Sequence, residues 1–425
     1  MPKQKDSLFS ASGPAILFDQ PNQKWSILKG VSVASGDNSA ILTNGHDGGR
    51  LINKGFIIGS TTPAPNAGFR LFDSDNVTIE NRETGYMAGF TGLFADSSDG
   101  ISLLNEGTIA GSLYGVLGDD SSGLTIENHG AMSGGDAAVV VNFDVLDPSG
   151  PLIKNFGTLT SEGTQVGSLD EATIILNIPD AKATIKNKGG GLIENNSGGL
   201  AVVVLEGRLN LNNKGTIIGG VDAADKNSDD IITNHGQITG QDDVPLILTY
   251  DGDDTVTNKG TITFTGNSSA VWTGGGNDTV INEGTIDKGV NLSDGNDVYK
   301  NKGGKVNGRI DPGSGNDKLV LGNSKDKIEF DDELGATNLN RVKNFESGKD
   351  KFFLDASDEF FGLTLGTLQK SEFTRGTEAK GPGAQIIYDK PSGDLWFAPS
   401  GSDKILFAEL DDDTKLKHDD FTVYA

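Results

Sequence analysis

Residues 279–286 read TVINEGTI, and residues 255–262 read TVTNKGTI. Both copies hold a short apolar run, then Asn, one variable residue, Gly and a second apolar run. The ten steps between the first and last copies, from Asn53 to Asn301, cover 248 residues, a mean period of about 25 residues. A fixed period of this length is typical of a solenoid with one coil per repeat. The marker asparagines are Asn53, Asn81, Asn105, Asn128, Asn155, Asn187, Asn213, Asn234, Asn258, Asn282 and Asn301.

The coils are expected to consist of β-strands. Segments 139–146, 172–178 and 200–207 are rich in β-branched residues, and Gly, Asn and Asp turns separate the apolar runs. Stacked coils predict an all-β fold, a right-handed parallel β-helix in which each strand pairs with its equivalent one coil later. We expect the marker Asn amides to hydrogen-bond along the stack. We also expect Asn and the following Gly to take the left-handed backbone of a sharp corner.

Composition divides the chain into four segments. Residues 1–40 are expected to form an N-terminal cap, and residues 41–240 to form the parallel β-helix coils. Residues 241–330 continue the coils with an added motif and are expected to form a calcium-binding β-roll. The composition changes near Asn323, and residues 331–425, rich in aromatic side chains, predict a β-rich C-terminal module.

The charge and the absence of cysteine exclude several classes of partner and site. With 35 basic and 60 acidic residues, the formal charge of −25 argues against nucleic acid and anionic membrane surfaces. Zero Cys excludes disulfides and thiolate metals, and it suits a protein that leaves a reducing cytosol unfolded. No stretch approaches the roughly 18 apolar residues of a membrane helix, and the apolar run at 15–18 is shorter than a signal-peptide core. Export without an N-terminal signal is therefore expected if the protein leaves the cell.

Four late coils add a glycine–aspartate turn before the apolar run. The turns are DGDDTV (251–256), GGGNDTV (274–280), SDGNDVY (293–299) and GSGNDKL (313–319). Their final aspartates, Asp254, Asp278, Asp297 and Asp317, are separated by 24, 19 and 20 residues, one coil each. The four carboxylates should therefore stack along one edge of the solenoid.

Calcium is the ion that such an edge suits. Ca²⁺ takes six to eight oxygen ligands at flexible geometry, from carboxylates and backbone carbonyls. Thiol or paired-imidazole metals do not fit a chain without Cys and with four scattered His. Acidic turns with fewer glycines occur at 73–79, 95–103, 118–126 and 226–232, and these extend the acidic edge into earlier coils.

At these turns the chain resembles the repeats-in-toxin (RTX, haemolysin-type) family, whose nonapeptide reads G-G-x-G-x-D-x-apolar-x. The resemblance implies that the aspartates bind Ca²⁺ through their side chains and the glycines through carbonyls. Asp326, nine residues after Asp317, matches the half-coil spacing of the family and is expected on the opposite edge. Most coils here carry one match instead of two, which leaves the number of ions open. The expected ligand residues are Asp251, Gly252, Asp253, Asp254, Gly274, Gly276, Asn277, Asp278, Asp294, Gly295, Asn296, Asp297, Gly313, Gly315, Asn316, Asp317 and Asp326.

The C-terminal segment looks like the flanking regions of secreted members of that family. It contains RVKNFESGKDKFFLDAS (341–357) and ends in DDFTVYA (419–425). The resemblance implies a type I secretion apparatus as partner, with an uncleaved C-terminal signal. Residues 41–240 look instead like generic β-helix coils of adhesins and polysaccharide-acting enzymes.

Two classes of function follow. The first is a secreted structural or adhesive protein of the cell surface or matrix, folding on Ca²⁺ outside the cell and assembling with itself or with cell-surface polysaccharide. The alternative is an extracellular polysaccharide lyase, hydrolase or epimerase, although no acid/base cluster or catalytic motif is evident and inserted loops are confined to 142–151 and 161–171. Ice binding by a Thr face is a weaker option, because Phe56, Ala131 and Gln237 interrupt that column.

Overall fold

The computed structural model describes residues 2–62, 66–143, 149–162, 172–241, 244–357, 359–400 and 403–425. These residues form an all-β parallel β-solenoid of about 14 turns with almost no helix. They group into two compact units, unit 1 (Met1–Asp225 and Asn234–Leu246) and unit 2 (Lys226–Thr233 and Ile247–Ala425). Residues 144–148 and 163–171, within the two loops expected from the sequence, lie outside the described residues.

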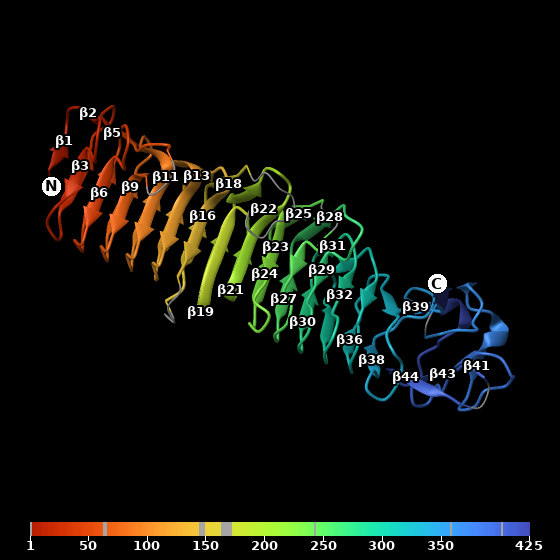
Figure 1. The fold of residues 1–425 in the computed structure, drawn as a ribbon. Helices are drawn as coiled ribbons and strands as arrows, with labels where there is room; N and C mark the ends of the chain where they lie inside the picture. Colours follow the sequence, from red (N-terminus) through yellow and green to blue (C-terminus); the bar gives the residue numbers. More distant parts are fainter. Residues whose placement is uncertain are drawn as a thin grey trace. The chain divides into compact units, whose positions relative to one another are not determined.

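Unit 1 contains three columns of short strands, and Figure 1 shows successive strands lying side by side. Each strand pairs in parallel with its counterpart one coil later, as β10 does with β7 and β12. The first column, which ends at the marker asparagines, comprises β4 (Lys24–Ile27), β7 (Arg50–Asn53), β10 (Thr78–Asn81), β12 (Ser102–Asn105), β14 (Thr125–Asn128), β17 (Leu152–Asn155) and the ends of β19 (Ile174–Asn187) and β21 (Leu200–Asn213). The short strand β24 (Ile231–Asn234) has residues in both units.

The other two columns of unit 1 follow the same pairing rule. The second column comprises β2 (Leu8–Ser10), β5 (Ser32–Ser35), β8 (Phe56–Ile58), the starts of β11 (Tyr86–Asp96) and β13 (Thr108–Asp119), β15 (Ala131–Gly134), β18 (Thr158–Ser161), β20 (Leu192–Asn195), β22 (Thr216–Ile218) and β25 (Gln237–Gly240). The third comprises β3 (Ile16–Phe18), β6 (Ile41–Asn44), β9 (Ala67–Phe72), the ends of β11 and β13, β16 (Ala137–Asn142), the starts of β19 and β21, and β23 (Gly220–Ala223).

The described strands of residues 2–40, which the sequence assigns to an N-terminal cap, pair with the coils that follow by the same rule. Strand β1 (Lys3–Gln4) pairs in parallel with β4, placing Gln4 opposite Ile27. Strands β2 and β3 pair with β5 and β6 in the same way. The first strands therefore already follow the columns of the coils behind them.

Alternating apolar side chains fill the interior of unit 1. Leu51, Ile79 and Leu103 occupy one register position on β7, β10 and β12, and each is at most 1% exposed. Burying a side chain of this size stabilises the fold by about 1.5–3 kcal/mol. Because each coil repeats the position, the core grows by stacking and does not widen.

The marker asparagines form the expected ladder. In unit 1 the Nδ2 of Asn81 donates to the Oδ1 of Asn105 at 2.7 Å, and Asn105 donates likewise to Asn128 at 2.8 Å. The same bond links consecutive markers from Asn53 to Asn234 in unit 1, and Asn258 to Asn282 in unit 2. The stacked amides therefore satisfy one another along the ladder of unit 1, whereas Asn282 Nδ2 and Asn301 Oδ1 in unit 2 have no partner.

The expected left-handed corner at the Asn–x–Gly motif is wrong. The marker asparagines end strands, and none of them is among the described residues with positive φ. The glycine is needed for a different reason: a Cβ on Gly130 would lie 2.0 Å from the carbonyl oxygen of Gly107 in the coil before. Close stacking of consecutive backbones selects glycine there, whereas Gly303 in the Asn301 copy has a φ of +87° and nothing within 4 Å of its Cβ.

Unit 2 continues the parallel pairing with shorter strands. Its coils contain β26 (Ile247–Leu248), β27 (Thr255–Asn258), β28 (Thr261–Phe264), β29 (Val271–Trp272), β30 (Thr279–Asn282), β31 (Thr285–Ile286), β32 (Val290–Asn291), β33 (Val298–Asn301), β34 (Lys305–Val306), β35 (Ile310–Asp311), β36 (Lys318–Val320), β37 (Lys327–Phe330), β38 (Asn340–Lys343) and β39 (Lys351–Asp355). The β27, β30, β33 and β36 strands pair consecutively in register.

Residues 356–425 belong to the same compact unit and add antiparallel pairing. Strands β44 and β45 pair in parallel with β38 and β39, and stacked rings such as Phe345 on Phe352, with centroids 4.5 Å apart, fill the interior. The elements are β40 (Gly366–Thr367), β41 (Phe373–Arg375), β42 (Gln385–Tyr388), β43 (Asp394–Ala398), β44 (Ile405–Leu410), β45 (Phe421–Tyr424) and the 3-10 turns η1 (Lys370–Glu372) and η2 (His418–Asp420).

Candidate metal centre

Four loops of unit 2 turn an aspartate into the interior. Each loop ends directly before one of the strands β27, β30, β33 and β36. The terminal aspartates of the loops are at most 1% exposed. We call these four side chains the carboxylate row: Asp254, Asp278, Asp297 and Asp317.

One oxygen of each carboxylate in the row links neighbouring coils. The backbone N–H of Asp254 donates to Oδ1 of Asp278 at 2.8 Å, and the N–H of Asp278 donates to Oδ1 of Asp297 at 2.7 Å. The N–H of Asp297 donates to Oδ1 of Asp317 at 2.8 Å. At the far end the N–H of Asp317 donates to Oδ1 of Asn340 at 3.1 Å. Because an amide oxygen replaces the carboxylate there, this bond requires an acceptor but not a charge.

The second oxygen of each carboxylate is left without a partner. Oδ2 of all four members is buried and accepts no hydrogen bond. Asp230, one coil earlier, differs because its Oδ2 accepts the hydroxyl of Ser228 at 3.1 Å. Successive coils are about 4.8 Å apart, so the Oδ2 atoms recur at about that interval. A buried polar atom without a partner costs about 1–3 kcal/mol, and more when it is charged.

Burial makes the ionised form of the row unfavourable. Desolvation raises the pKa of Asp254 and Asp297 to about 8. The same cause raises the pKa of Asp317 to about 7 and that of Asp278 to about 6. Adjacent carboxylates add to the desolvation, as Asp317 and Asp278 do for Asp297. At neutral pH the row therefore holds protons or requires a cation.

Two threonine hydroxyls lie near the row and offset part of this rise in pKa, Thr249 at Asp254 and Thr273 at Asp278. Their hydrogen bonds nevertheless run to the backbone. The Thr249 hydroxyl donates to the carbonyl of Thr273 at 3.0 Å, and the Thr273 hydroxyl donates to the carbonyl of Leu292 at 3.1 Å. Because each hydroxyl has one proton to donate, a threonine that donates to the backbone does not donate to the nearby carboxylate of Asp254 or Asp278 at the same time.

The residue before each row member forms a second, exposed column. The N–H of Asn277 donates to Oδ1 of Asp253 at 2.7 Å, and the N–H of Asn296 donates to Oδ1 of Asn277 at 3.1 Å. Asn316 repeats the contact with Asn296 at 3.1 Å. These oxygens already bind backbone of the next coil, so the column is explained by coil stacking. Asp229, which the motif did not include, accepts from Asp253 in the same way at 3.0 Å.

The glycines of the motif allow the coils to approach closely. Gly252, Gly276, Gly295 and Gly315 have φ between +125° and +155°. A Cβ on Gly276 would lie 2.0 Å from the carbonyl oxygen of Gly252, and one on Gly315 would lie 1.5 Å from that of Gly295. Gly274 and Gly313 repeat the arrangement, with a Cβ 2.0 Å from Tyr250 O and 1.8 Å from Ser293 O. Any larger residue would push the loops and the row apart.

The remaining predicted ligands lie elsewhere. Asp251 and Asp294 are exposed, and Asp294 accepts the hydroxyl of Ser314 at 2.5 Å. Asp326 is buried, but its oxygens accept from Asn301 Nδ2 at 2.9 Å and from the Gly322 N–H at 3.2 Å. Asp326 lies directly before β37, its N–H donates to Oδ1 of Asp350 at 3.0 Å, and it therefore belongs to a different strand column from the carboxylate row.

The row is a feature of unit 2. In unit 2 each row aspartate lies four residues before a marker asparagine or its equivalent. Coils of unit 1 carry buried apolar residues at that position, namely Val77, Ile101 and Leu124. The earlier acidic turns supply surface residues instead: Oδ1 of Asp75 accepts the N–H of Asp99 at 2.8 Å, and Oδ1 of Asp99 accepts the Ser122 N–H at 2.7 Å. Those acids resemble the exposed column and not the row.

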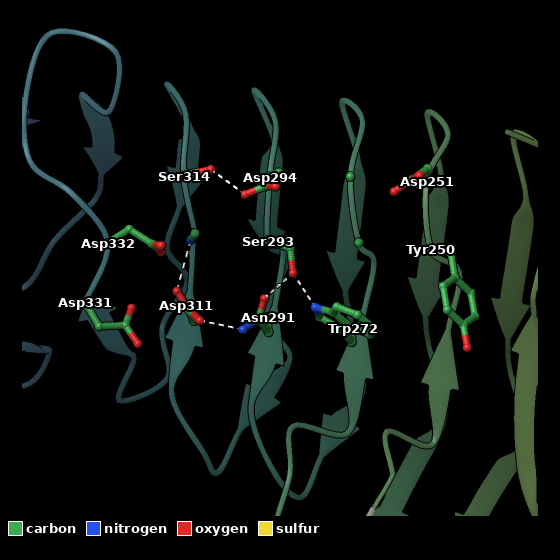
Figure 2. A pocket seen from close by; sticks show the side chains of 13 residues that line it. Tyr250, Asp251, Trp272, Asn291, Ser293, Asp294, Asp311, Ser314, Asp331 and Asp332 are labelled. Carbon is green, nitrogen blue, oxygen red and sulfur yellow. Dashed lines mark hydrogen bonds between the residues drawn. The ribbon is translucent and has the colours of Figure 1, made fainter. Parts of the chain in front are cut away.

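A cavity of about 390 Å³ in unit 2 is lined by four predicted ligand residues, Asp251, Gly274, Asp294 and Gly313, together with residues that the sequence did not single out. It holds Asp311, Asp331 and Asp332, whose carboxylate oxygens lie within 4.8 Å of one another, and Figure 2 shows them together at one end. At the other end lie Tyr250 and Trp272. No motif links these residues, because they come from separate coils and from the segment after β37. The spacing of these residues, about one coil apart, is the feature of the sequence that could have indicated that they lie together.

No family model matches this chain, and no curated protein matches it. Among the described residues, no helix is long and apolar enough to cross a membrane.

The donor set of the row has a definite chemical preference. Its unpartnered atoms are all carboxylate oxygens, which suit hard cations such as Ca²⁺. Each Oδ2 is held in place because the Oδ1 of the same group binds backbone. The row therefore offers a cation four carboxylate oxygens that are held in place and bind nothing else.

Proposed function

We propose that this chain is an extracellular structural or adhesive protein whose unit 2 is stabilised by calcium along the carboxylate row. The observation that carries the proposal is the run of four buried Oδ2 atoms without partners. Such a run of buried oxygens lowers the stability of the fold by itself, and a bound cation would make the same oxygens stabilising. Among the described residues, the row is also where the predicted glycine–aspartate motif and the unpartnered oxygens coincide.

Calcium fits the row better than other common ions. Mg²⁺ demands near-ideal octahedral geometry and keeps several waters, whereas Ca²⁺ accepts flexible sets of carboxylates and carbonyls. The chain has no Cys, so softer thiolate-binding metals lack their preferred ligand. Carbonyl oxygens of Gly252, Gly276 and Gly295 lie along the same loops and add further hard donors.

Calcium dependence also supports an extracellular location. Where free Ca²⁺ is scarce, repulsion among 60 acidic residues and the unneutralised row oppose folding. Where Ca²⁺ is plentiful, binding energy becomes folding energy. A chain without Cys whose unit 2 becomes stable only outside the cell suits export with that unit unfolded, and we include a type I apparatus in the proposal. Stable stacked coils then provide a rigid element for a surface layer or matrix.

The test is a calcium titration of thermal unfolding for the parent chain, Asp278→Asn and Asp297→Asn. Asparagine keeps the Oδ1 acceptor, as Asn340 does, but removes the charge. In chelator each variant should be at least as stable as the parent, because an unfavourable buried carboxylate is gone. At saturating calcium each should gain about 1–2 kcal/mol less than the parent.

Asp253→Asn is the matched control. It changes an exposed aspartate to the residue that the next coils carry at that position, Asn277 and Asn296. Its calcium response should equal that of the parent. If the two row variants respond to calcium as fully as this control, the assignment of calcium to the row is wrong.

A further inference from the structure

The cavity of unit 2 runs across the coils beside the loops that carry the carboxylate row. Its lining comes from five consecutive coils, represented by Tyr250, Trp272, Asn291, Asp311 and Asp331. At about 4.8 Å per coil, that is a groove of roughly 20 Å. Figure 2 shows these side chains arranged one after another along the groove. A groove of this length suits a chain-like ligand.

The aromatic end of the groove offers a platform. The rings of Tyr250 and Trp272 have centroids 6.1 Å apart at an interplanar angle of 61°, and both side chains are half-buried. The indole N–H of Trp272 donates to the Ser293 hydroxyl, which in turn donates to Asn291 Oδ1 at 2.8 Å. Because its polar edge is already bonded, the indole is held in place and offers its faces to a flat apolar surface.

The rest of the groove is lined by hydrogen-bond acceptors. Five of its thirteen lining residues are aspartates, and none of the thirteen is Lys, Arg or His: Asp251, Asp294, Asp311, Asp331 and Asp332. Carboxylates accept hydrogen bonds and cannot donate when ionised. A ligand that fits must therefore bring donors, and an acidic ligand would be repelled.

The acidic end is already under electrostatic strain. Asp311 is 9% exposed, and it accepts from Asn291 Nδ2 at 2.6 Å and from the Gly313 N–H at 2.9 Å. The carboxylate oxygens of Asp311, Asp331 and Asp332 lie within 4.8 Å of one another, so their negative charges repel. A ligand that places a positive or strongly donating group here would relieve that repulsion.

We propose that this groove binds a non-acidic glycan chain, with a sugar ring on Trp272 and hydroxyl or ammonium groups donated to Asp311, Asp331 and Asp332. An aromatic platform beside acceptor groups matches the two kinds of surface of a sugar ring, one face of C–H groups and a rim of hydroxyls. Amine-bearing sugars should bind most tightly, because the lining carries five carboxylates and no basic residue. This surface is separate from the carboxylate row, so the two proposals can fail independently.

The experiment measures binding of three tetrasaccharides by titration calorimetry at saturating calcium, with the full chain. The probes are a glucosamine tetramer, cellotetraose and tetragalacturonate, which are cationic, neutral and anionic. The glucosamine tetramer should bind most tightly and tetragalacturonate at least tenfold more weakly than cellotetraose. Equal or tighter binding of tetragalacturonate, or no binding of any probe, would overturn the proposal.

Variants separate recognition of a sugar from simple charge attraction. Trp272→Ala should weaken binding of both non-acidic probes about tenfold or more, whereas Trp272→Phe should retain most of it. Phe156→Ala removes an exposed aromatic of unit 1 and should change nothing. Asp332→Asn, on a partly exposed side chain, should reduce the preference for the glucosamine tetramer over cellotetraose. This variant tests the proposal if Trp272→Ala does not fold.

Two further outcomes count against the proposal. If spermidine binds as tightly as the glucosamine tetramer and Trp272→Ala leaves both unchanged, charge alone explains the groove. If calcium competes stoichiometrically with the sugars, the acidic end is a metal site instead. The calcium midpoint of unfolding should stay at the parent value in Trp272→Phe, which distinguishes this test from that of the row.

Discussion

At the residue scale, the structure separates two uses of buried polar side chains in the same kind of stack. A marker asparagine carries a donor and an acceptor, and Asn105 uses both, between Asn81 and Asn128. A row aspartate has acceptors only, so its Oδ1 binds backbone and its Oδ2 has no partner. An ionised carboxylate in that place requires a cation, whereas an amide does not.

This difference predicts an unusual dependence on pH for the metal-free protein. The folded-state pKa of the row is raised, to about 6 for Asp278 and about 8 for Asp254, from 3.8 for an ordinary aspartate. Between pH 4 and 8 the folded state thus binds more protons than the unfolded state, and stability falls as pH rises. In chelator the midpoint of thermal unfolding should be higher at pH 5 than at pH 8.

Calcium should flatten this profile, because a bound cation replaces the protons. Glu80 and Glu127 in unit 1 have lowered pKa values, so their contribution is present above about pH 4.5 and lost only below it. Glu80 and Glu127 therefore do not change how the stability depends on pH between pH 5 and 8. A chelated protein that is more stable at pH 8 than at pH 5 would contradict the account of the row.

At the scale of the elements, the loops of unit 2 depend on glycine at positions where two coils nearly touch. Gly276→Ala should destabilise unit 2 by more than about 2 kcal/mol, because its Cβ would lie 2.0 Å from a carbonyl oxygen at a φ of +125°. Gly303→Ala is the matched control, since Gly303 has a φ of +87° and nothing within 4 Å of its Cβ. It should cost only about 1 kcal/mol. Chemical denaturation in calcium measures both, and equal losses would refute the role of close approach.

The elements also show what the sequence could and could not reveal. The period of the marker asparagines predicted the parallel coils and the amide ladder, because both depend on residues that recur locally. The reason for the glycine that follows marker asparagines such as Asn128 was misjudged, since a contact between coils is invisible in one repeat. Gly130 faces the carbonyl of Gly107 in the coil before and does not form a left-handed turn.

The sequence likewise predicted some features of the candidate site and missed others. The motif identified the carboxylate row, but it did not reveal that Oδ1 of Asp278 is committed to backbone while Oδ2 is not. It placed Asp326 on the opposite edge, but it did not reveal that the oxygens of Asp326 already have partners. The groove went unseen because Trp272 and Asp311 share no residue pattern and meet only when the coils stack.

At the scale of the whole molecule, calcium dependence should be confined to unit 2. Unit 1 fills the equivalent positions with Val77, Ile101 and Leu124 and closes its ladder with neutral amides. Hydrogen exchange should therefore find the strands of unit 1 equally protected with and without calcium. Strands β27, β30 and β33 should lose protection in chelator. Loss of protection throughout unit 1 as well would show that calcium acts on more than the row.

The most direct test is a crystal structure of the full chain grown in calcium, with anomalous scattering used to locate the ions. The account predicts anomalous peaks about 2.3–2.6 Å from Oδ2 atoms of the carboxylate row, Asp254, Asp278, Asp297 and Asp317. Peaks found only on surface acids, with the row dry and protonated at saturating calcium, would contradict it.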